Sequence, residues 1–220
     1  LNDIIPNLSG MFDEPFGDPS AIPTYVVSKF ARSSVTVALT GDGADEIFGG
    51  YNHYRRANQI WSTVKKIPAG ARGLATLMLG PVGKQMYETS LGRKAEKLSN
   101  YLSCQSLFDC YRFQTQSSDF ELLSVLKSPT EVSRFQNLSL RSDSDAMMFA
   151  DMHTYLPDDI LVKVDRAGMS VSLETRAPFL DHHVVELGYN LPPEFKIAGS
   201  NSKVILRDLL ARYIPRKIFE

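Results

Sequence analysis

Residues 35–51 read Val-Thr-Val-Ala-Leu-Thr-Gly-Asp-Gly-Ala-Asp-Glu-Ile-Phe-Gly-Gly-Tyr. The opening residues are β-branched or apolar, which predicts a strand over residues 34–40 that is buried on both of its faces. The polar turn after them contains two glycines, which permit positive φ and a close approach to the backbone. Asp45 and Glu46 then fall in the first turn of an expected helix, where acidic side chains are favoured. The stretch therefore predicts a strand, a tight turn and a helix.

The turn at the end of this strand has two interpretations. In parallel α/β sheets, ligands bind at the carboxyl ends of strands, where exposed amides suit a phosphate. The carboxylates of Asp42, Asp45 and Glu46 suit a divalent cation that bridges to phosphate. From the spacing alone, an ordinary turn with acidic capping explains the pattern equally well. The stretch is neither a Walker A loop nor a dinucleotide motif, because no Gly-Lys-Ser/Thr follows and Glu46 replaces the third glycine.

The composition is that of an ordinary globular protein. The chain has 220 residues, enough for one large domain or two small ones, with 43% hydrophobic and 22% charged residues. A net charge of −1 argues against a dedicated nucleic-acid surface. Cys104 and Cys110 make neither a disulfide framework nor a zinc site, which favours a reducing cytoplasm. No apolar run is long enough for a membrane span.

Beyond this strand the periodicity predicts mostly helices, with one or few parallel strands in all. We expect a helix capped by Ser20, a helix capped by Asp181 that ends before Pro192, and a last helix that stops before Pro215. Prolines and glycines mark the other boundaries. The expected ranges are 21–32, 51–66, 69–79, 82–102, 107–115, 121–126, 143–156 and 158–171.

Charged residues within the apolar helix 158–171 are the second notable pattern. Asp159, Lys163 and Arg166 share one face at spacings i, i+4 and i+7, which suits either a solvated charge ladder or a site. The loop 12–20 leaves a similar choice, because its acids are either turn and cap residues or site residues. His182 and His183 are expected at the surface, since no third metal ligand is evident. An ion pair between Glu174 and Arg176 is expected to tie down a loop.

Residues 39–51 resemble the second nucleotide-site motif of the asparagine synthetases, Leu-Ser/Thr-Gly-Asp/Glu-Gly-Ser/Ala-Asp-Glu-x-Phe-Gly-Gly-Tyr. Further segments resemble other blocks of that family, in the same order along the chain: 13–20, 156–181, 191–193, 203–207 and 214–215. The resemblance implies part of an α/β ATP-pyrophosphatase domain. It divides the chain into a nucleotide-site half (1–66), a variable helical region (67–142) and a helical second block (143–220).

The resemblance also implies an activity, that of a ligase in asparagine biosynthesis. Such an enzyme adenylates the β-carboxylate of aspartate with ATP and Mg²⁺, releases pyrophosphate, and lets ammonia from glutamine displace AMP. Position by position, it implies nucleotide contacts at Thr40, Gly41 and Gly43, and Mg²⁺ binding at Asp45. It implies catalytic roles for three residues, Asp42, Asp159 and Lys163.

Three features of the family are missing from these 220 residues. There is no Ser-Gly-Gly-x-Asp-Ser pyrophosphate loop, because Ser9-Gly10 is followed by Met11-Phe12. The lysine-bearing phosphate loop expected beyond residue 215 is incomplete, and the glutaminase domain with its N-terminal Cys is absent. We therefore expect a fragment that is inactive alone.

Other functions remain open at this point. The substrate is aspartate or a related carboxylate, since related amidotransferases and cyclases carry similar motifs. A non-catalytic helical interaction module is a different class of protein, for which the acids of the turn would be dispensable. A phosphoryl-transfer enzyme is disfavoured because no Walker lysine is present. We expect no nucleic-acid or membrane partner, and self-association as a homodimer through the exposed edge of the predicted strand.

Overall fold

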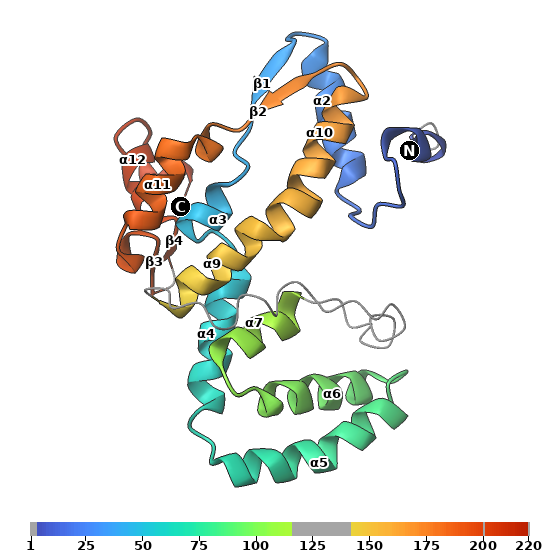
Figure 1. Ribbon diagram of the computed structural model, residues 1–220, viewed down its shortest axis with the longest axis vertical. Helices are drawn as coiled ribbons and strands as arrows, with labels where there is room; N and C mark the ends of the chain where they lie inside the picture. Colours follow the sequence, from blue (N-terminus) through green and yellow to red (C-terminus); the bar gives the residue numbers. More distant parts are fainter. Residues whose placement is uncertain (1–3, 116–141, 200, 220) are drawn as a thin grey trace. The chain divides into compact units, whose positions relative to one another are not determined.

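The computed structural model describes residues 4–115, 142–199 and 201–219 (Figure 1). The chain forms two compact units. The first combines both ends of the chain, Leu1–Gly50 and Met148–Glu220, and the second contains Tyr51–Met147. Helices dominate and the strands are short, as expected from the sequence. None of the described helices is both long and apolar enough to cross a membrane.

The sheet of the first unit joins two segments that are far apart in sequence. Strand β1 (Val37–Leu39) runs parallel to β2 (Glu174–Arg176), with Val37 opposite Glu174. Two further bonds extend the ladder, from the amide of Glu174 to the carbonyl of Thr36 (2.9 Å) and from the amide of Thr40 to the carbonyl of Arg176 (2.8 Å). A separate antiparallel hairpin consists of β3 (Ile197–Ala198) and β4 (Asn201–Ser202).

The prediction that the first strand is buried on both faces is wrong. Strand β1 is shorter than the predicted 34–40, and the side chains of Val37 and Leu39 are 40% and 74% exposed. The physical reason is that β1 has a partner along one edge only, within the described residues. A strand of parallel sheet is buried only when neighbouring strands and helices cover both its faces.

In the first unit, α10 contacts β2 and packs against α2 (Figure 1). Helix α2 has the predicted bounds, although Phe30 on it is 80% exposed. The prediction that Ser20 caps this helix is wrong, because the Ser20 hydroxyl donates to Oδ2 of Asp18 and accepts no amide of α2. The helices of this unit are η1 (Ile5–Asn7), α1 (Leu8–Met11), α2 (Ala21–Arg32), α3 (Ala44–Phe48), the π-helix η3 (Leu156–Leu161), α10 (Val162–Met169), η4 (Pro178–Leu180), α11 (His182–Asn190), η5 (Pro193–Phe195), α12 (Val204–Leu210) and η6 (Arg216–Ile218).

Pro157 does not end its helix, contrary to the prediction. Helix α9 (Asp143–His153) leads through the single π turn of η3 into α10. Pro157 lies at the start of that turn, and the amide of Asp158 still donates to the carbonyl of Thr154 (3.0 Å). A π turn accommodates an extra residue without breaking the helix, and such turns are common at functional sites.

Helix α3 is held by very close packing. A Cβ on Gly188 of α11 would lie 2.1 Å from a methyl carbon of Ile47, so only glycine lets the two helices approach this closely. Gly43 precedes α3 with φ of +87°, and a Cβ there would lie 2.3 Å from the Leu180 side chain. The position of the turn before α3 is therefore fixed by packing on η4 and α11.

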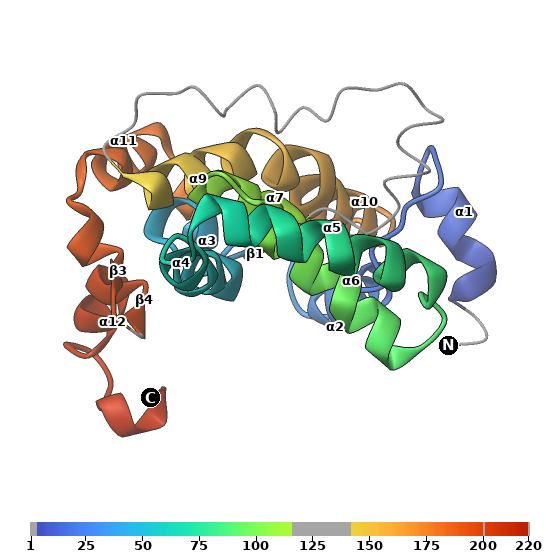
Figure 2. The same cartoon turned by 90° about the horizontal axis from the view of Figure 1, so that it is seen from below.

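The second unit is a set of helices, α4 (Asn52–Val64), α5 (Ala69–Gln85), α6 (Ser90–Ser103), α7 (Leu107–Thr115) and the start of α9. Helices α5 and α6 lie side by side (Figure 2), while α4 packs on α7 through the buried rings of Tyr54 and Tyr111. Cys104 and Cys110 are buried and free. The predicted helix 121–126 lies outside the described residues.

The predicted stop of a helix at Gly80-Pro81 is also wrong. Helix α5 continues through Pro81 to Gln85, and the break comes later, so the predicted helix 82–102 begins at Ser90 instead. Proline removes its own amide donor and frees the carbonyl of residue 77. Both Pro81 and Leu77 are exposed, so water can take the place of the lost partner.

Two glycines of α5 test its packing on α6. A Cβ on Gly83 would lie 2.6 Å from the backbone nitrogen of Glu96, whereas none of the described atoms comes within 4 Å of a Cβ on Gly73. We expect Gly83→Ala to destabilise the protein by about 1–3 kcal/mol, because the backbone of α6 must move away. Gly73→Ala should stabilise it by about 0.5–1 kcal/mol through helix propensity. Urea unfolding of both variants measures the difference, and equal effects would refute this packing.

Candidate functional site

The polar turn after β1 is open to solvent at one point. Thr40 is fixed by the bond from its amide to the carbonyl of Arg176. The next residue, Gly41, is exposed, and none of the described atoms lies within 4 Å of where its Cβ would be. Asp42 is partly exposed beside it. A ligand can therefore reach the backbone at Gly41, while Gly43 faces Leu180 and shapes the turn from the buried side.

Asp45 is the residue predicted to bind Mg²⁺, and it carries an ion pair. The Lys203 ammonium donates to its Oδ1 at 2.9 Å. A Cβ on Gly50 would lie 1.8 Å from that oxygen, so the glycine makes room for the pair. Lys203 has φ of +51°, a conformation that costs a non-glycine residue free energy and that clusters at functional sites. The sequence analysis did not predict that Lys203 lies beside Asp45, because neither this contact nor the left-handed backbone of Lys203 has a signal in the sequence.

The turn fits Mg²⁺ only in company with a phosphate. Glu46 is 2% exposed, so its carboxylate does not face the open side of the turn. Asp45 retains its second oxygen, and Mg²⁺ is usually held by one or two carboxylates together with phosphate oxygens and water. The donor set at Asp45 is therefore compatible with a metal that arrives with a nucleotide.

Among the described residues, the group whose ligand atoms lie close enough to hold a metal ion is Asp181, His182 and His183, all exposed. The two histidines are at the surface as predicted, and Asp181 is a neighbouring carboxylate that the sequence did not single out as a third ligand. Asp181 caps α11 as predicted, because its Oδ1 accepts the backbone amide of His183 at 2.9 Å. The same oxygen lies 3.1 Å from His183 Nδ1, so the carboxylate is already engaged.

The second group of predicted site residues lies on η3 and α10. Lys163 is only 7% exposed, and its ammonium donates to Oδ2 of Asp18 at 2.5 Å. Asp159 Oδ1 lies 3.9 Å from the same nitrogen, on the face predicted from the i, i+4 spacing. The alternative of a solvated ladder is wrong for Lys163, because this lysine is buried against Asp18. The loop acid that meets Lys163 is 145 residues away in sequence.

These contacts alter the acidities of the carboxyl groups. Burial raises the pKa of Asp18, but hydrogen bonds from Lys163 and Ser20 outweigh it and bring the pKa to about 2. Burial raises the pKa of Asp159, and the neighbouring charge of Asp18 raises it further, against the opposing effect of Lys163. Tyr155 has a raised pKa from burial and from the charges of Asp159, Asp18, Asp151 and Glu46. The carboxylates whose charges act on Tyr155 therefore come from the loop before α2, from α3, from α9 and from η3.

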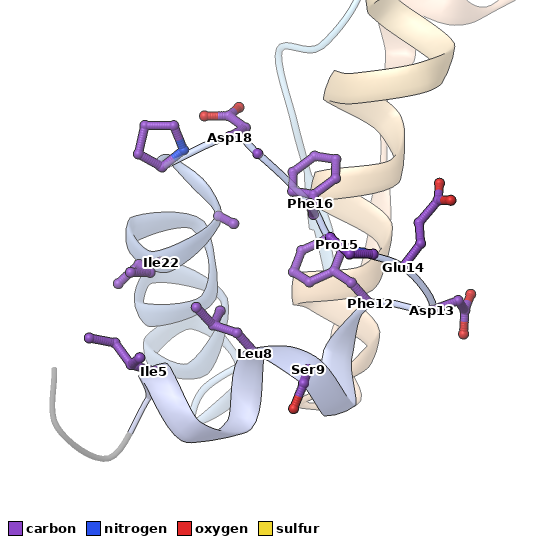
Figure 3. A pocket seen from close by; sticks show the side chains of 13 residues that line it. Ile5, Leu8, Ser9, Phe12, Asp13, Glu14, Pro15, Phe16, Asp18 and Ile22 are labelled. Atoms are coloured by element: carbon purple, nitrogen blue, oxygen red, sulfur yellow. The ribbon is translucent and has the colours of Figure 1, made fainter. Parts of the chain in front are cut away.

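A second ion pair, in addition to that of Asp18 with Lys163, joins the loop before α2 to α10. Arg166 donates to Asp13 at 2.8 Å, but here the Asp13 side chain is 82% exposed. Behind the loop is a hollow of about 670 Å³, lined by residues of η1, α1, the loop and the start of α2. Phe12 and Phe16 stack on this side with ring centroids 4.6 Å apart, while the carboxylates of Asp13 and Glu14 point away (Figure 3).

The two groups of predicted site residues remain separate in their direct contacts. Among the described residues, no hydrogen bond or ion pair joins residues 40–45 to Asp159 or Lys163. What connects them is the parallel pairing of β1 with β2, which follows α10 in the chain. The predicted ion pair between Arg176 and Glu174 forms at 2.7 Å, at the exposed end of this sheet.

The low pKa of Asp18 predicts a pH-dependent stability. The folded pKa of about 2 lies below the ordinary 3.8, so the stabilisation is complete above pH 4 and is lost as the pH falls toward 2. Asp18→Asn should therefore lower the free energy of unfolding at pH 7 by on the order of 2 kcal/mol. The difference in free energy of unfolding between wild type and Asp18→Asn, measured by urea unfolding, should decrease as the pH falls from 4 to 2. A gap that stays constant over this range would contradict the ion pair.

Comparison with known proteins identifies the relatives of this chain. The family model described as asparagine synthase matches residues 1–220. The chain is 34% identical to glutamine-hydrolyzing asparagine synthetase 1 of Bacillus subtilis, over 97% of this chain and 34% of that protein. It is 24% identical to the amidase chyE of Penicillium rubens, over 84% of this chain and 31% of that protein. None of the solved structures gives a significant match.

The chain spans about a third of the length of the curated relatives it matches. The matched family has the α/β ATP-pyrophosphatase fold, in agreement with the helices and the short parallel sheet observed here. Because the family model covers all 220 residues, and because the B. subtilis synthetase aligns over nearly all of them, the chain belongs to the asparagine synthase family.

Proposed function

We propose that the protein carrying this chain is an amide-forming ligase that activates a side-chain carboxylate with ATP and transfers the acyl group to ammonia. The observation that carries the proposal is the parallel pairing that joins Thr40 to Arg176, 136 residues apart. It brings the turn after β1 and the segment after β2 to the same end of a sheet, where α/β proteins bind ligands. The name of the B. subtilis relative supports aspartate as substrate and glutamine as the source of ammonia.

In this proposal the turn after β1 binds the nucleotide. The open backbone at Thr40 and Gly41 receives it, and Gly43 keeps the turn in shape. Asp45 contributes a carboxylate to Mg²⁺, which, when bound, neutralises phosphate charge and favours departure of pyrophosphate. Lys203 forms an ion pair with Asp45 and so places a positive charge beside the same turn.

The chemistry proceeds in two displacements. A carboxylate oxygen of the substrate attacks the α-phosphorus of ATP, and pyrophosphate leaves. The nitrogen of ammonia then attacks the acyl carbon, the bond to the AMP oxygen breaks, and one proton must leave the nitrogen. We assign to Asp42 the orientation of the adenylate and the amine, and to Asp159 with Lys163 the handling of this proton. Exclusion of water protects the mixed anhydride from hydrolysis.

The proposal extends to the parts of the chain and their partners. Residues 1–66 and 143–220 would carry the two halves of the site, with the region 67–142 between them. Since no pyrophosphate loop of the family type occurs within residues 1–220, we expect these residues alone not to turn over. We further propose a cytoplasmic protein. We also propose that it self-associates through β1, which pairs along one edge only within the described residues.

A second candidate is amide formation on a different carboxylate. The similarity to a fungal amidase supports it, since the same chain aligns with a relative that carries another name. An assay of pyrophosphate release from ATP by the full-length protein, with aspartate and other small dicarboxylates tested one at a time, distinguishes the two candidates. The carboxylate that supports release is the substrate.

Asp42 provides the direct test of the proposed function. We expect Asp42→Asn in the full-length protein to lower amide formation by about 100-fold or more, because the carboxylate that organises the amine attack is lost. Asp42→Glu is the matched control, and it should retain most activity because the motif in the family carries Asp or Glu here. Pyrophosphate release and amide formation are measured together. If Asp42→Asn is as active as wild type, the turn has no catalytic role and a non-catalytic module becomes the better interpretation.

A further inference from the structure

Lys163 lies between two carboxylates at unequal distances. Its ammonium is 2.5 Å from Asp18 and 3.9 Å from Asp159, and only the first distance is that of a hydrogen bond. The lysine is almost fully buried, so water cannot replace either partner. The position of the ammonium is therefore set by Asp18, which comes from a different part of the chain.

Asp18 is itself held rigidly. Its Oδ1 accepts the backbone amide of Ser20 at 2.8 Å, and its Oδ2 accepts the Ser20 hydroxyl at 2.7 Å. Pro19 lies between the two residues and fixes its own φ. With Lys163 as a third donor, the carboxylate has three hydrogen bonds and little freedom to turn. Asp18 thus fixes the lysine from the start of α2.

Asp159 is left with a charge that the lysine only partly compensates. Its Oδ1 is buried and has no hydrogen-bond donor among the described residues. The groups that act on it are Asp18 from the loop and Lys163 from α10. The charge of Asp159 in turn acts on Tyr155, together with the charges of Asp18, Asp151 and Glu46. Burial and the charge of Asp18 both favour the protonated form of Asp159. The ionised Asp159 carboxylate, with its raised pKa, therefore accepts a proton more readily than an ordinary aspartate does.

We propose that Asp18 is a positioning residue that keeps the Lys163 ammonium away from Asp159, so that Asp159 accepts the proton released when the amine attacks. The inference rests on the proposed function and specifies its second displacement. As the carbon–nitrogen bond forms and the bond to AMP breaks, AMP leaves with the electron pair and one proton passes from the nitrogen to Asp159. Activation of the carboxylate by ATP does not involve this proton.

The test compares Asp18→Asn with wild type in the full-length protein. Removal of the Asp18 charge lets Lys163 turn to Asp159, and both effects lower the pKa of Asp159. The acid limb of the kcat profile for amide formation should move about one pH unit lower. At neutral pH, kcat should fall roughly threefold to tenfold because the base is weaker, with KM for the carboxylate little changed. Exchange of labelled pyrophosphate into ATP should stay within about twofold of wild type, since the first displacement does not use this base.

Asp13→Asn is the matched control. It removes the other ion pair between the same loop and the same helix, but at an exposed position that does not touch Lys163. We expect this variant to change neither the pH profile nor the ratio of the two partial reactions. Thermal unfolding of both variants at pH 7 establishes that they are folded at the assay temperature.

The outcomes separate this inference from the function on which it rests. One contrary result is that Asp18→Asn lowers pyrophosphate exchange and amide formation in the same proportion, and another is that the acid limb of its kcat profile coincides with that of wild type. Either result would show that Asp18 only holds the loop against α10 and has no positioning role. A wild-type protein that performs neither partial reaction overturns the proposed function and this role with it. A selective loss of amide formation with a shifted limb, absent from Asp13→Asn, supports the positioning role.

Discussion

The parallel pairing of β1 with β2 is the constraint on which the first unit depends. It joins Thr36 and Thr40 to Glu174 and Arg176, so that two ends of the chain fold as one unit. Two strands of three residues have little stability of their own. The pair persists because α10, which leads into β2, packs on α2, which leads into β1. The packing of these helices therefore sets the register of the two strands. The register in turn determines where the polar turn after β1 lies relative to the segment after β2.

The turn itself is held by its surroundings more than by its own residues. Gly43 lies against Leu180 and Gly188 lies against Ile47, so η4 and α11 determine where α3 begins. On the other side, Lys203 reaches Asp45 from the start of α12. The open face at Gly41 is then what remains after close packing on the other sides. A backbone fixed in this way needs no rearrangement to receive a ligand, which lowers the entropic cost of binding.

Local signals in the sequence predicted local structure well. Helices α2 and α7 have the predicted bounds, since their apolar spacing lies within the segments themselves. Strand β2 could not be found in this way, because Glu-Thr-Arg has no apolar alternation and becomes a strand only through β1. The stops expected at Pro81 and Pro157 were wrong because exposure at one site and a π turn at the other make the lost hydrogen bond tolerable.

For the candidate site, the spacing within a helix predicted that Asp159 and Lys163 share a face, and motif similarity singled out the turn. Neither could show that Lys163 is buried, because that depends on an aspartate 145 residues away. The same holds for Lys203, whose partner Asp45 is distant in sequence. Contacts between distant charges are therefore the part of the site that only the fold reveals.

The burial of Lys163 has a consequence for how this site is interpreted. Moving an ammonium and a carboxylate out of water costs several kcal/mol for each ion, and their attraction often does no more than offset that cost. An apolar pair of the same size would stabilise the junction of the loop with α10 as well or better. The exposed pair of Asp13 with Arg166 already clips the two segments together at low cost. What the buried pair adds is a positive charge held at a fixed place near a second carboxylate, and this feature, which holding the loop does not require, is the one on which the role proposed for Asp18 rests.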